Sequence, residues 1–149
     1  MKIQELLAPS DTMIGVRADD NNGLLRNLCR HAASSVRLSF DQIVTEIMKR
    51  ETLGSTGMGE GVAIPHARLP GMERPFGLLA RLKHPIDFDA IDGKPVDPVF
   101  LLLLPVASHG EQLNALASVA RLLRKTETIS ELRRATSGDG LYGAMTAES

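Results

Sequence analysis

The residues best suited to chemistry lie between Arg50 and Arg68, in the sequence RETLGSTGMGEGVAIPHAR. His66 follows Pro65 there, at the end of a short apolar run that predicts a strand. Because proline fixes φ, the backbone that carries the imidazole has little freedom. A neutral imidazole is available near pH 7, since its unperturbed pKa is about 6.5, and its nitrogen is a nucleophile. On its own, His66 is also consistent with a histidine that makes only a local hydrogen bond.

The segment before His66 is rich in groups that bind anions. Its four glycines, within Gly54–Gly61, permit positive φ, and successive N–H groups in such loops can converge on one anion. Ser55 and Thr56 add hydroxyl donors, and Arg50 adds a guanidinium whose fork matches a phosphate group. The glycine content indicates neither a helix nor a regular strand, and a plain tight connection would also explain it.

Two familiar phosphate motifs do not fit this segment. A Walker loop ends in Gly-Lys-Ser/Thr, but Gly61 is followed by Val62. A dinucleotide fingerprint requires a helix directly after the glycines, whereas Pro65 disfavours helical backbone at Ile64. A phosphate bound here is therefore not expected to belong to a nucleotide cofactor.

The stretch GSTGMGEGVAIPHAR resembles the active-site signature of the mannitol/fructose-type IIA proteins of the bacterial phosphotransferase system, above all their nitrogen-regulatory branch. That signature is Arg-Glu-x-x-Gly-Ser-Thr-Gly-x-Gly-x-Gly-x-Ala-x-Pro-His, which the chain matches from Arg50 to His66. The resemblance continues through Pro85–Asp97 (PIDFDAIDGKPVD) and the apolar strand that ends at Pro105, and it weakens towards both termini. It implies that residues 1–149 form a single domain of this type.

The resemblance implies a phosphorelay role for the protein. In this family the histidine after the proline accepts a phosphoryl group from the phosphocarrier HPr, which makes His66 the phosphoacceptor. Arg50, Ser55 and Thr56 are then the phosphate-binding residues beside it. Phosphoenolpyruvate and enzyme I would stand upstream, and no metal or other cofactor is expected at this step.

One position departs from the family pattern. A second active-site histidine usually stands just before a leucine, at the start of the helix after the central strand, and the matching residue here is Gln112, before Leu113. Glutamine can donate an N–H to a phosphoryl oxygen, which keeps Gln112 among the phosphate-binding residues, but it cannot carry charge or shuttle a proton. His109 lies three residues earlier, and its partial substitution for the missing histidine stays open.

The elements that must position these residues follow from the apolar pattern. Val99–Leu104 (VFLLLL) is apolar at every position, which is typical of a central strand covered on both faces. Further strands are expected at Met13–Val16, Val62–Ile64 and Phe76–Leu82, with a turn at Asp92 and Gly93. Helices are expected from Gly23 to about Ala33, from the Ser39–Gln42 capping box to about Arg50, from the Ser108–Glu111 capping box, from about Glu127 and from about Gly140. This order predicts a single-domain α/β fold, with a mixed sheet layered with helices on both sides.

Composition excludes several classes of protein and site. Lys and Arg total 17 against 18 Asp and Glu, and aromatic residues make up only 3%, so no nucleic-acid binding is expected. The single cysteine, Cys29, lies in an apolar helical pattern typical of a core residue. His31 and His84 need no functional role, and a metal site built from His66, His84 and His109 matches no known zinc spacing. Without a long apolar run, a cytoplasmic protein with no membrane insertion is expected.

The leading hypothesis is a nitrogen-branch regulator that uses the phosphorylation state of His66 to regulate its partners. Sensor kinases and potassium transport proteins are typical partners of that branch. One alternative is a sugar-specific IIA component that passes phosphate to a separate IIB protein for fructose or mannitol. Another is a binding-only regulator with weakened relay chemistry, for which Gln112 is the argument. Ile64, Leu69 and Met72 flank His66 in sequence and are expected to form the apolar docking face around it.

Overall fold

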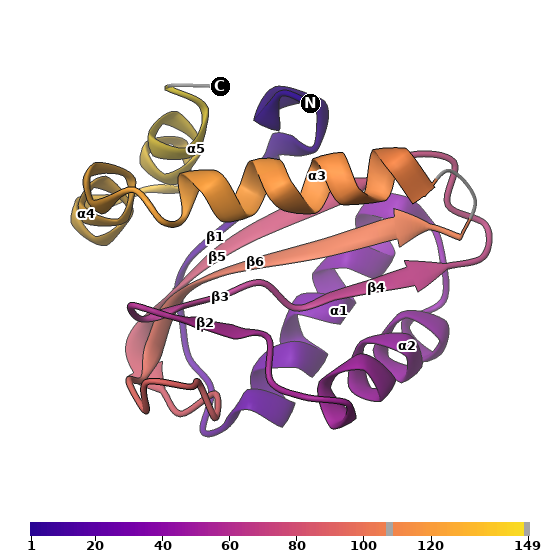
Figure 1. Ribbon diagram of the computed structural model, residues 1–149, viewed down its shortest axis with the longest axis horizontal. Coiled ribbons are helices and arrows are strands. Elements are labelled where there is room, and N and C mark those ends of the chain that lie inside the picture. Colours follow the sequence, from indigo (N-terminus) through magenta and orange to yellow (C-terminus); the bar gives the residue numbers. More distant parts are fainter. Residues whose placement is uncertain (107–108, 148–149) are drawn as a thin grey trace.

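A six-stranded mixed sheet lies between two layers of helices in the computed structural model, which describes residues 1–106 and 109–147, with only the backbone at positions 109 and 111–113 (Figure 1). The sheet order is β1 (Leu7–Val16), β5 (Phe76–Ile86), β6 (Val96–Pro105), β3 (Val62–Ala63) and β2 (Gly57–Gly59), and β4 (His66–Leu69) also pairs with β6. Strand β5 runs parallel to β1 and antiparallel to β6, whereas β3 and β4 run parallel to β6. Because β5 occupies one edge of β6, β3 and β4 follow one another along its other edge.

Two helical layers cover the two faces of this sheet. The helices are α1 (Asn21–Val36) and α2 (Phe40–Thr52) on one face, and α3 (His109–Leu122), α4 (Thr126–Arg134) and α5 (Gly138–Thr146) on the other, with a short 3-10 helix, η1 (Ile3–Glu5). The predicted fold class, a mixed sheet layered with helices on both sides, is confirmed. Within the described ranges, no helix combines the length and the apolar character needed to cross a membrane.

Strand β6 explains why both layers are needed. Val99, Leu101 and Leu103 point into the core formed with α1 and α2, and Phe100 and Leu102 point into the core formed with α3, α4 and α5. All five side chains are fully buried, as the uninterrupted apolar run predicted. Successive strand residues face opposite sides of a sheet, so a strand without polar positions must be covered twice.

Local capping fixes where α1 and α2 begin. The carboxylate of Asp20 accepts a hydrogen bond from the Gly23 N–H at 2.8 Å, and α1 begins directly after Asp20. The Ser39 hydroxyl accepts one from the Gln42 N–H at 3.1 Å and starts α2, as its capping pattern predicted. The corresponding pattern at Ser108 lies outside the described residues, although the predicted helix is present from His109.

Three expectations about strands were wrong. Strand β1 begins at Leu7 rather than Met13, because a bulge between Leu7 and Thr12 accommodates residues that break the apolar pattern. The glycine-rich segment is not free of regular structure, since Gly57–Gly59 forms β2 and pairs with β3. His66 does not end a strand but begins β4. The remaining boundaries differ by a few residues, as in β5, which extends to Ile86.

Replacing Phe100 by alanine tests the two-sided cover of β6. The ring of Phe100 is fully buried under the α3 layer, so Phe100→Ala should lower the free energy of unfolding by about 3–5 kcal/mol in urea titrations. Ile91→Ala is the matched control, because Ile91 is fully exposed and its loss should change stability by no more than about 0.5 kcal/mol. A Phe100→Ala loss as small as that of the control would contradict this packing.

Candidate functional site

His66 is held at the start of β4, beside the central strand. It pairs with Leu102 of β6, and the Leu102 N–H donates to the carbonyl of Pro65 at 2.9 Å. The next residues alternate, with Ala67 buried against the α1–α2 core and Arg68 exposed. Since alternate strand residues share a face, His66 and Arg68 both project from the face that α3 covers.

A hydrogen bond within the backbone turn sets the tautomer of His66. Its Nδ1 lies 2.8 Å from the carbonyl oxygen of Ile64. A carbonyl oxygen only accepts, so in the neutral ring Nδ1 carries the proton. The lone pair is then on Nε2, which makes Nε2 the nucleophilic nitrogen.

The surroundings of His66 favour its neutral form. Partial burial of the imidazole lowers the pKa of His66 below 6.5. The hydrogen bond to Ile64 and the nearby carboxylate of Glu51 act in the opposite direction, while the positive charge of Arg50 adds to the lowering. The ring is therefore mostly uncharged at pH 7 and can act as a nucleophile.

Two hollows meet at the imidazole. One, of about 410 Å³, is lined by Glu46, Lys49, Arg50, Leu53, His66, Ala67, Arg68, Leu104 and Leu116. The other, of about 240 Å³, is lined by Arg50, Ser55, Thr56, Gly57, Met58, Ile64, His66, Leu116 and Ala120. Both contain Arg50, His66 and Leu116, so His66 lies between α2, the β2–β3 hairpin and α3.

Three cationic side chains line the 410 Å³ hollow at His66, together with the carboxylate of Glu46, which lies 3.3 Å from the ammonium of Lys49. Arg50 lies in the last turn of α2, where its Nη1 donates to the carbonyl of Gly54 at 2.9 Å and so uses one of five N–H donors. Lys49 and Arg68 line the same hollow, and neither was predicted from the sequence. Arg68 stands two residues after His66, and this spacing puts both side chains on one face of a strand. The spacing is informative only if β4 begins at His66, which was not predicted.

Ser55 and Thr56 lie beside His66, but their hydroxyl protons are engaged within the protein. Ser55 donates to the carbonyl of Phe88 and accepts from the Gly57 N–H, and Thr56 donates to the carboxylate of Glu51. To donate to a phosphoryl oxygen, either hydroxyl would have to exchange its present partner. Their role in phosphate binding stays a prediction.

Helix α3 brings the position of the missing second histidine towards the site. Leu116 and Ala120 of this helix line the hollow on the hairpin side of His66. Position 112 lies one turn before Leu116, on the same face of the helix. The side chains of Gln112 and His109 are outside the described part of the structure, so the proposed roles of Gln112 and His109 stay predictions.

The predicted docking face is wrong. Ile64 and Leu69 are buried in the cores on opposite faces of the sheet, and Met72 is half-buried against the α1–α2 core. Ile64 and Leu69 are needed to fill the interior and are not available to a partner. The apolar surface beside His66 comes instead from Leu53, which follows α2 and is 84% exposed, and from half-buried Leu116 of α3.

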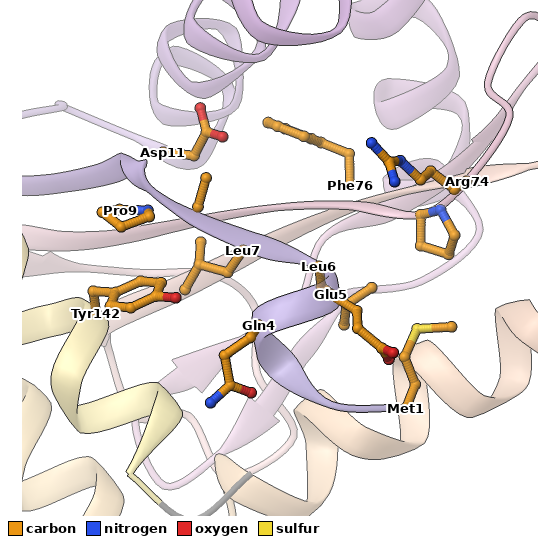
Figure 2. Close-up of a pocket in the computed structure, with 12 residues that line it drawn as sticks. Met1, Gln4, Glu5, Leu6, Leu7, Pro9, Asp11, Arg74, Phe76 and Tyr142 are labelled. Atoms are coloured by element: carbon orange, nitrogen blue, oxygen red, sulfur yellow. The ribbon is translucent and has the colours of Figure 1, made fainter.

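Another hollow, of about 650 Å³, lies away from His66, around the N-terminal segment, and none of the predicted site residues lines it. Figure 2 shows Arg74 and Phe76 on one side of that segment and Gln4 and Tyr142 on the other. Asp11 lines it, and its carboxylate also accepts from Ser35 at 2.6 Å, which ties this region to α1.

The remaining candidate groups do not gather into a second reactive site. Cys29 is fully buried, and burial raises the pKa of its thiol to about 12, which makes it unreactive as expected of a core residue. His31 contacts the carboxylate of Asp11 at 3.1 Å, and His84 lies within β5. Among the side chains that the structure describes, three or more His, Cys, Asp or Glu residues nowhere group in a way that could hold a metal ion.

Residues 5–147 match the family described as "Phosphoenolpyruvate-dependent sugar phosphotransferase system, EIIA 2". Since this match spans nearly the whole chain, the chain belongs to that family, as its resemblance in sequence indicated.

Within the family, the chain is similar to nitrogen regulatory proteins. It is 39% identical over 145 residues to a "Nitrogen regulatory protein" of Bradyrhizobium diazoefficiens, which covers 97% of this chain and 95% of that one. The crystal structure of the nitrogen regulatory protein IIA-Ntr from Neisseria meningitidis superimposes with a TM-score of 0.91 at 32% identity, covering 97% and 99% of the two chains. A fructose-specific EIIABC component of Bacillus subtilis is 30% identical over 142 residues, which is 95% of this chain but 22% of that longer protein.

The pKa of His66 can be tested by NMR titration of its ring. We expect wild-type His66 to titrate below pH 6.5, because burial disfavours the charged ring. Arg50→Gln should raise that pKa, since it removes a positive charge that opposes protonation. Arg124→Gln, which removes an exposed charge between α3 and α4, should leave it unchanged. A midpoint above 6.5 in the wild type, or equal midpoints in the wild type and Arg50→Gln, would contradict this description of the site.

Proposed function

We propose that the chain, as one EIIA domain over residues 1–149, is a histidine phosphocarrier that accepts a phosphoryl group from an HPr-type carrier on His66. The observation that carries the proposal is the hydrogen bond from Nδ1 of His66 to the carbonyl of Ile64, which leaves the Nε2 lone pair free beside Arg50. A histidine that only stabilised the fold would not need a neutral, half-exposed ring surrounded by cations.

The proposed transfer uses this geometry. The bond between phosphorus and the donor histidine breaks as the bond to Nε2 of His66 forms, and the ring proton of His66 stays on Nδ1. Phosphoryl transfer has a loose transition state, so catalysis consists mainly of positioning and of cations around the equatorial oxygens. Arg50 can supply N–H donors to those oxygens, and Lys49 and Arg68 add positive charge in the same hollow.

A donor protein must come close to Nε2, and the surface around His66 suits such an approach. Leu53 presents an exposed apolar side chain directly after α2, and Leu116 presents a half-buried one from α3. These two residues replace the docking face that was expected from sequence. Apolar contacts flanked by cations fit a protein partner that carries a phosphoryl group.

The similarity to nitrogen regulatory proteins supports a regulatory role for the phosphorylated and unphosphorylated forms. In this role the state of His66 would control binding to cellular partners. Sensor kinases and potassium transport proteins are the proposed partner classes, on the strength of the family resemblance. A phosphoryl group carries roughly two negative charges at pH 7, so it changes the face that a partner would contact.

A sugar-specific IIA component is the second candidate, and the similarity to a fructose-specific EIIABC component favours it. In that case His66 would pass its phosphoryl group to a separate IIB protein. Incubating the phosphorylated chain with candidate IIB proteins separates the two roles, because only the sugar role predicts rapid loss of the label to IIB. The binding-only alternative, which rests on Gln112 and weakened relay chemistry, predicts little or no phosphorylation.

The direct test is phosphorylation with enzyme I, an HPr-type carrier and radiolabelled phosphoenolpyruvate. The wild type should be labelled, and His66→Ala should lose all label because the nucleophile is gone. His31→Ala is the matched control, since His31 contacts Asp11 away from both hollows and should retain wild-type labelling. An unlabelled wild type, or a labelled His66→Ala variant, would overturn the proposal.

Phosphorylation should also change the affinity for a regulatory partner. If the partner contacts the surface around His66, we expect the two forms to differ by about 1–3 kcal/mol in binding free energy, an ordinary coupling between two ligands. Isothermal titration of the partner against both forms, at one salt concentration, measures the difference. His66→Ala should bind as the unphosphorylated form does, whereas equal affinities of the two wild-type forms would leave His66 as a relay point only.

A further inference from the structure

The open end of the β2–β3 hairpin meets the His66 site through the peptide groups of Ile64. At its open end, the Ile64 N–H donates to the carbonyl of Thr56 at 3.1 Å. The carbonyl of Ile64 then accepts the hydrogen bond from Nδ1 of His66. The position of this hairpin therefore decides whether the acceptor that fixes the tautomer of His66 is in place.

The hairpin's own backbone pairing is short. Strand β2 has three residues and β3 has two, and β3 meets β6 through one register pair, Ala63 with Val99. At its closed end, Glu60 and Gly61 both have positive φ, 57° and 78°, as in the two-residue turns that suit hairpin twist. Glutamate is uncommon at positive φ, so this turn needs support from outside the hairpin.

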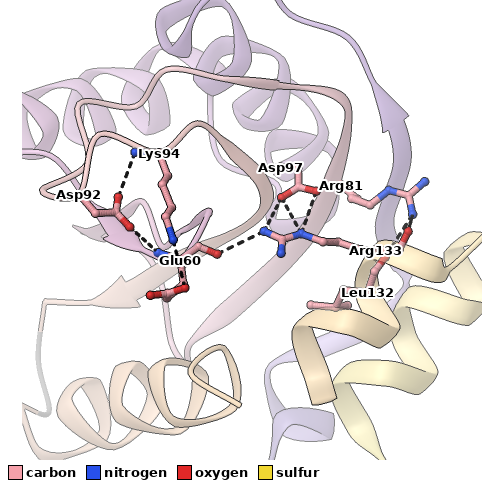
Figure 3. Close-up of polar contacts among 7 residues, drawn as sticks. All are labelled: Glu60, Arg81, Asp92, Lys94, Asp97, Leu132 and Arg133. Atoms are coloured by element: carbon pink, nitrogen blue, oxygen red, sulfur yellow. Dashed lines mark hydrogen bonds and ion pairs between the residues drawn. The ribbon is translucent and has the colours of Figure 1, made fainter. Parts of the chain in front are cut away.

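Arg133 of α4 supplies that support on the carbonyl side of the turn. Its Nη2 donates to the carbonyl of Glu60 at 3.2 Å. Its Nε and Nη2 also donate to the carboxylate of Asp97 at 3.0–3.1 Å, and the Asp97 N–H donates to the carbonyl of Gly61 at 3.1 Å. Figure 3 shows the guanidinium of Arg133 between Asp97 and Glu60. A Cβ at Gly61 would collide with that guanidinium, so glycine is needed for this approach.

Asp92 supports the turn on its N–H side. Its carboxylate accepts from the Glu60 N–H at 2.9 Å and from the Lys94 N–H at 3.1 Å, and these two hydrogen bonds lower the pKa of Asp92. The ammonium of Lys94 lies 3.5 Å from the carboxylate of Glu60. The peptide group on each side of Glu60 is thus held by a charged side chain from another part of the chain.

Arg133 is itself fixed by a second arginine. Nη1 of Arg81, on β5, lies within hydrogen-bond distance of the carbonyls of Leu132, Arg133 and Ala135, at 3.2, 2.9 and 2.7 Å. These carbonyls stand at the C-terminal end of α4, where backbone acceptors lack partners within the helix. Arg81 thereby holds the end of α4 against the sheet, which fixes the position from which the side chain of Arg133 projects.

We infer that Arg133 is a positioning residue for the phosphoacceptor: by holding the Glu60–Gly61 turn, it keeps the carbonyl of Ile64 aligned with Nδ1 of His66. The inference rests on the proposed function for its effect on phosphoryl transfer, but its effect on the histidine ring does not. Arg133 lies outside both hollows at His66, so it acts through the hairpin and not through contact with the phosphoryl group.

Replacing Arg133 by alanine should loosen the turn and displace the Ile64 carbonyl. Without that acceptor the ring proton redistributes between Nδ1 and Nε2, which lowers the fraction of His66 with a free Nε2 lone pair. We expect the rate of phosphoryl uptake to fall about two- to tenfold, the factor that follows from losing one ordinary hydrogen bond. Asp97→Asn, which keeps an acceptor but removes its charge, should produce a smaller change in the same direction.

The test measures the tautomer of His66 by ring ¹⁵N shifts in the unphosphorylated protein, and separately the rate of uptake from a phosphorylated HPr-type carrier. Arg134→Ala is the matched control, because the neighbouring Arg134 pairs only with exposed Glu131 on its own helix among the ion pairs described. A tautomer shift in Arg133→Ala and Asp97→Asn, but not in Arg134→Ala, supports the inference. Folded Arg133→Ala and Asp97→Asn proteins with wild-type tautomer populations would overturn it.

The two readouts keep this inference apart from the proposed function. If the wild type takes up no phosphoryl group while the tautomer still shifts in Arg133→Ala, the proposed function fails and the positioning role stands. If Arg133→Ala does not fold, Asp97→Asn decides the positioning role by the same ring measurement. Arg133→Lys should restore little of the wild-type tautomer population, because a lysine cannot contact Asp97 and Glu60 with one planar fork.

Discussion

The continuous burial of β6 is the constraint on which the rest of this structure depends. A strand with no polar position from Val99 to Leu104 is stable only under cover on both faces, so two helical layers must form around it. Its edge beyond β5 is then free to pair with β3 and β4, and the register places His66 opposite Leu102. His66 is therefore held against the fully buried central strand, while many of the side chains that line its hollows come from α2, α3 and the β2–β3 hairpin.

Two chemical requirements meet at His66, and the fold satisfies them with different elements. A nucleophilic Nε2 requires a neutral ring with its proton on Nδ1, which the Ile64 carbonyl and partial burial provide. In the proposed function, the transferred phosphoryl group also requires nearby cations, and Arg50 of α2 and Arg68 of β4 line the hollow at His66. The two requirements agree, because the positive charge of Arg50 also disfavours protonation of the ring.

The sequence predicted the architecture and the family from a few strong signals. The central strand at Val99–Leu104 and the Ser39 cap each depend on residues that are neighbours in the sequence. The sequence pattern is therefore enough to predict both. The hairpin at Gly57–Ala63 was missed because its glycines lack strand propensity and its turn depends on Arg133, more than seventy residues away in the sequence. The docking face was misassigned for a related reason: Ile64 and Leu69 alternate between two cores, which becomes visible only when the strand boundaries are known.

In the proposed function, His66 receives the phosphoryl group on Nε2 while the carbonyl of Ile64 holds the proton on Nδ1. The most direct test is NMR of the phosphorylated protein with ¹⁵N-labelled histidine, which detects the coupling between phosphorus and the ring nitrogen that bears it. We expect phosphorus coupling to Nε2 of His66 and a proton retained on Nδ1. Coupling to Nδ1, or to the ring of another histidine, would contradict it.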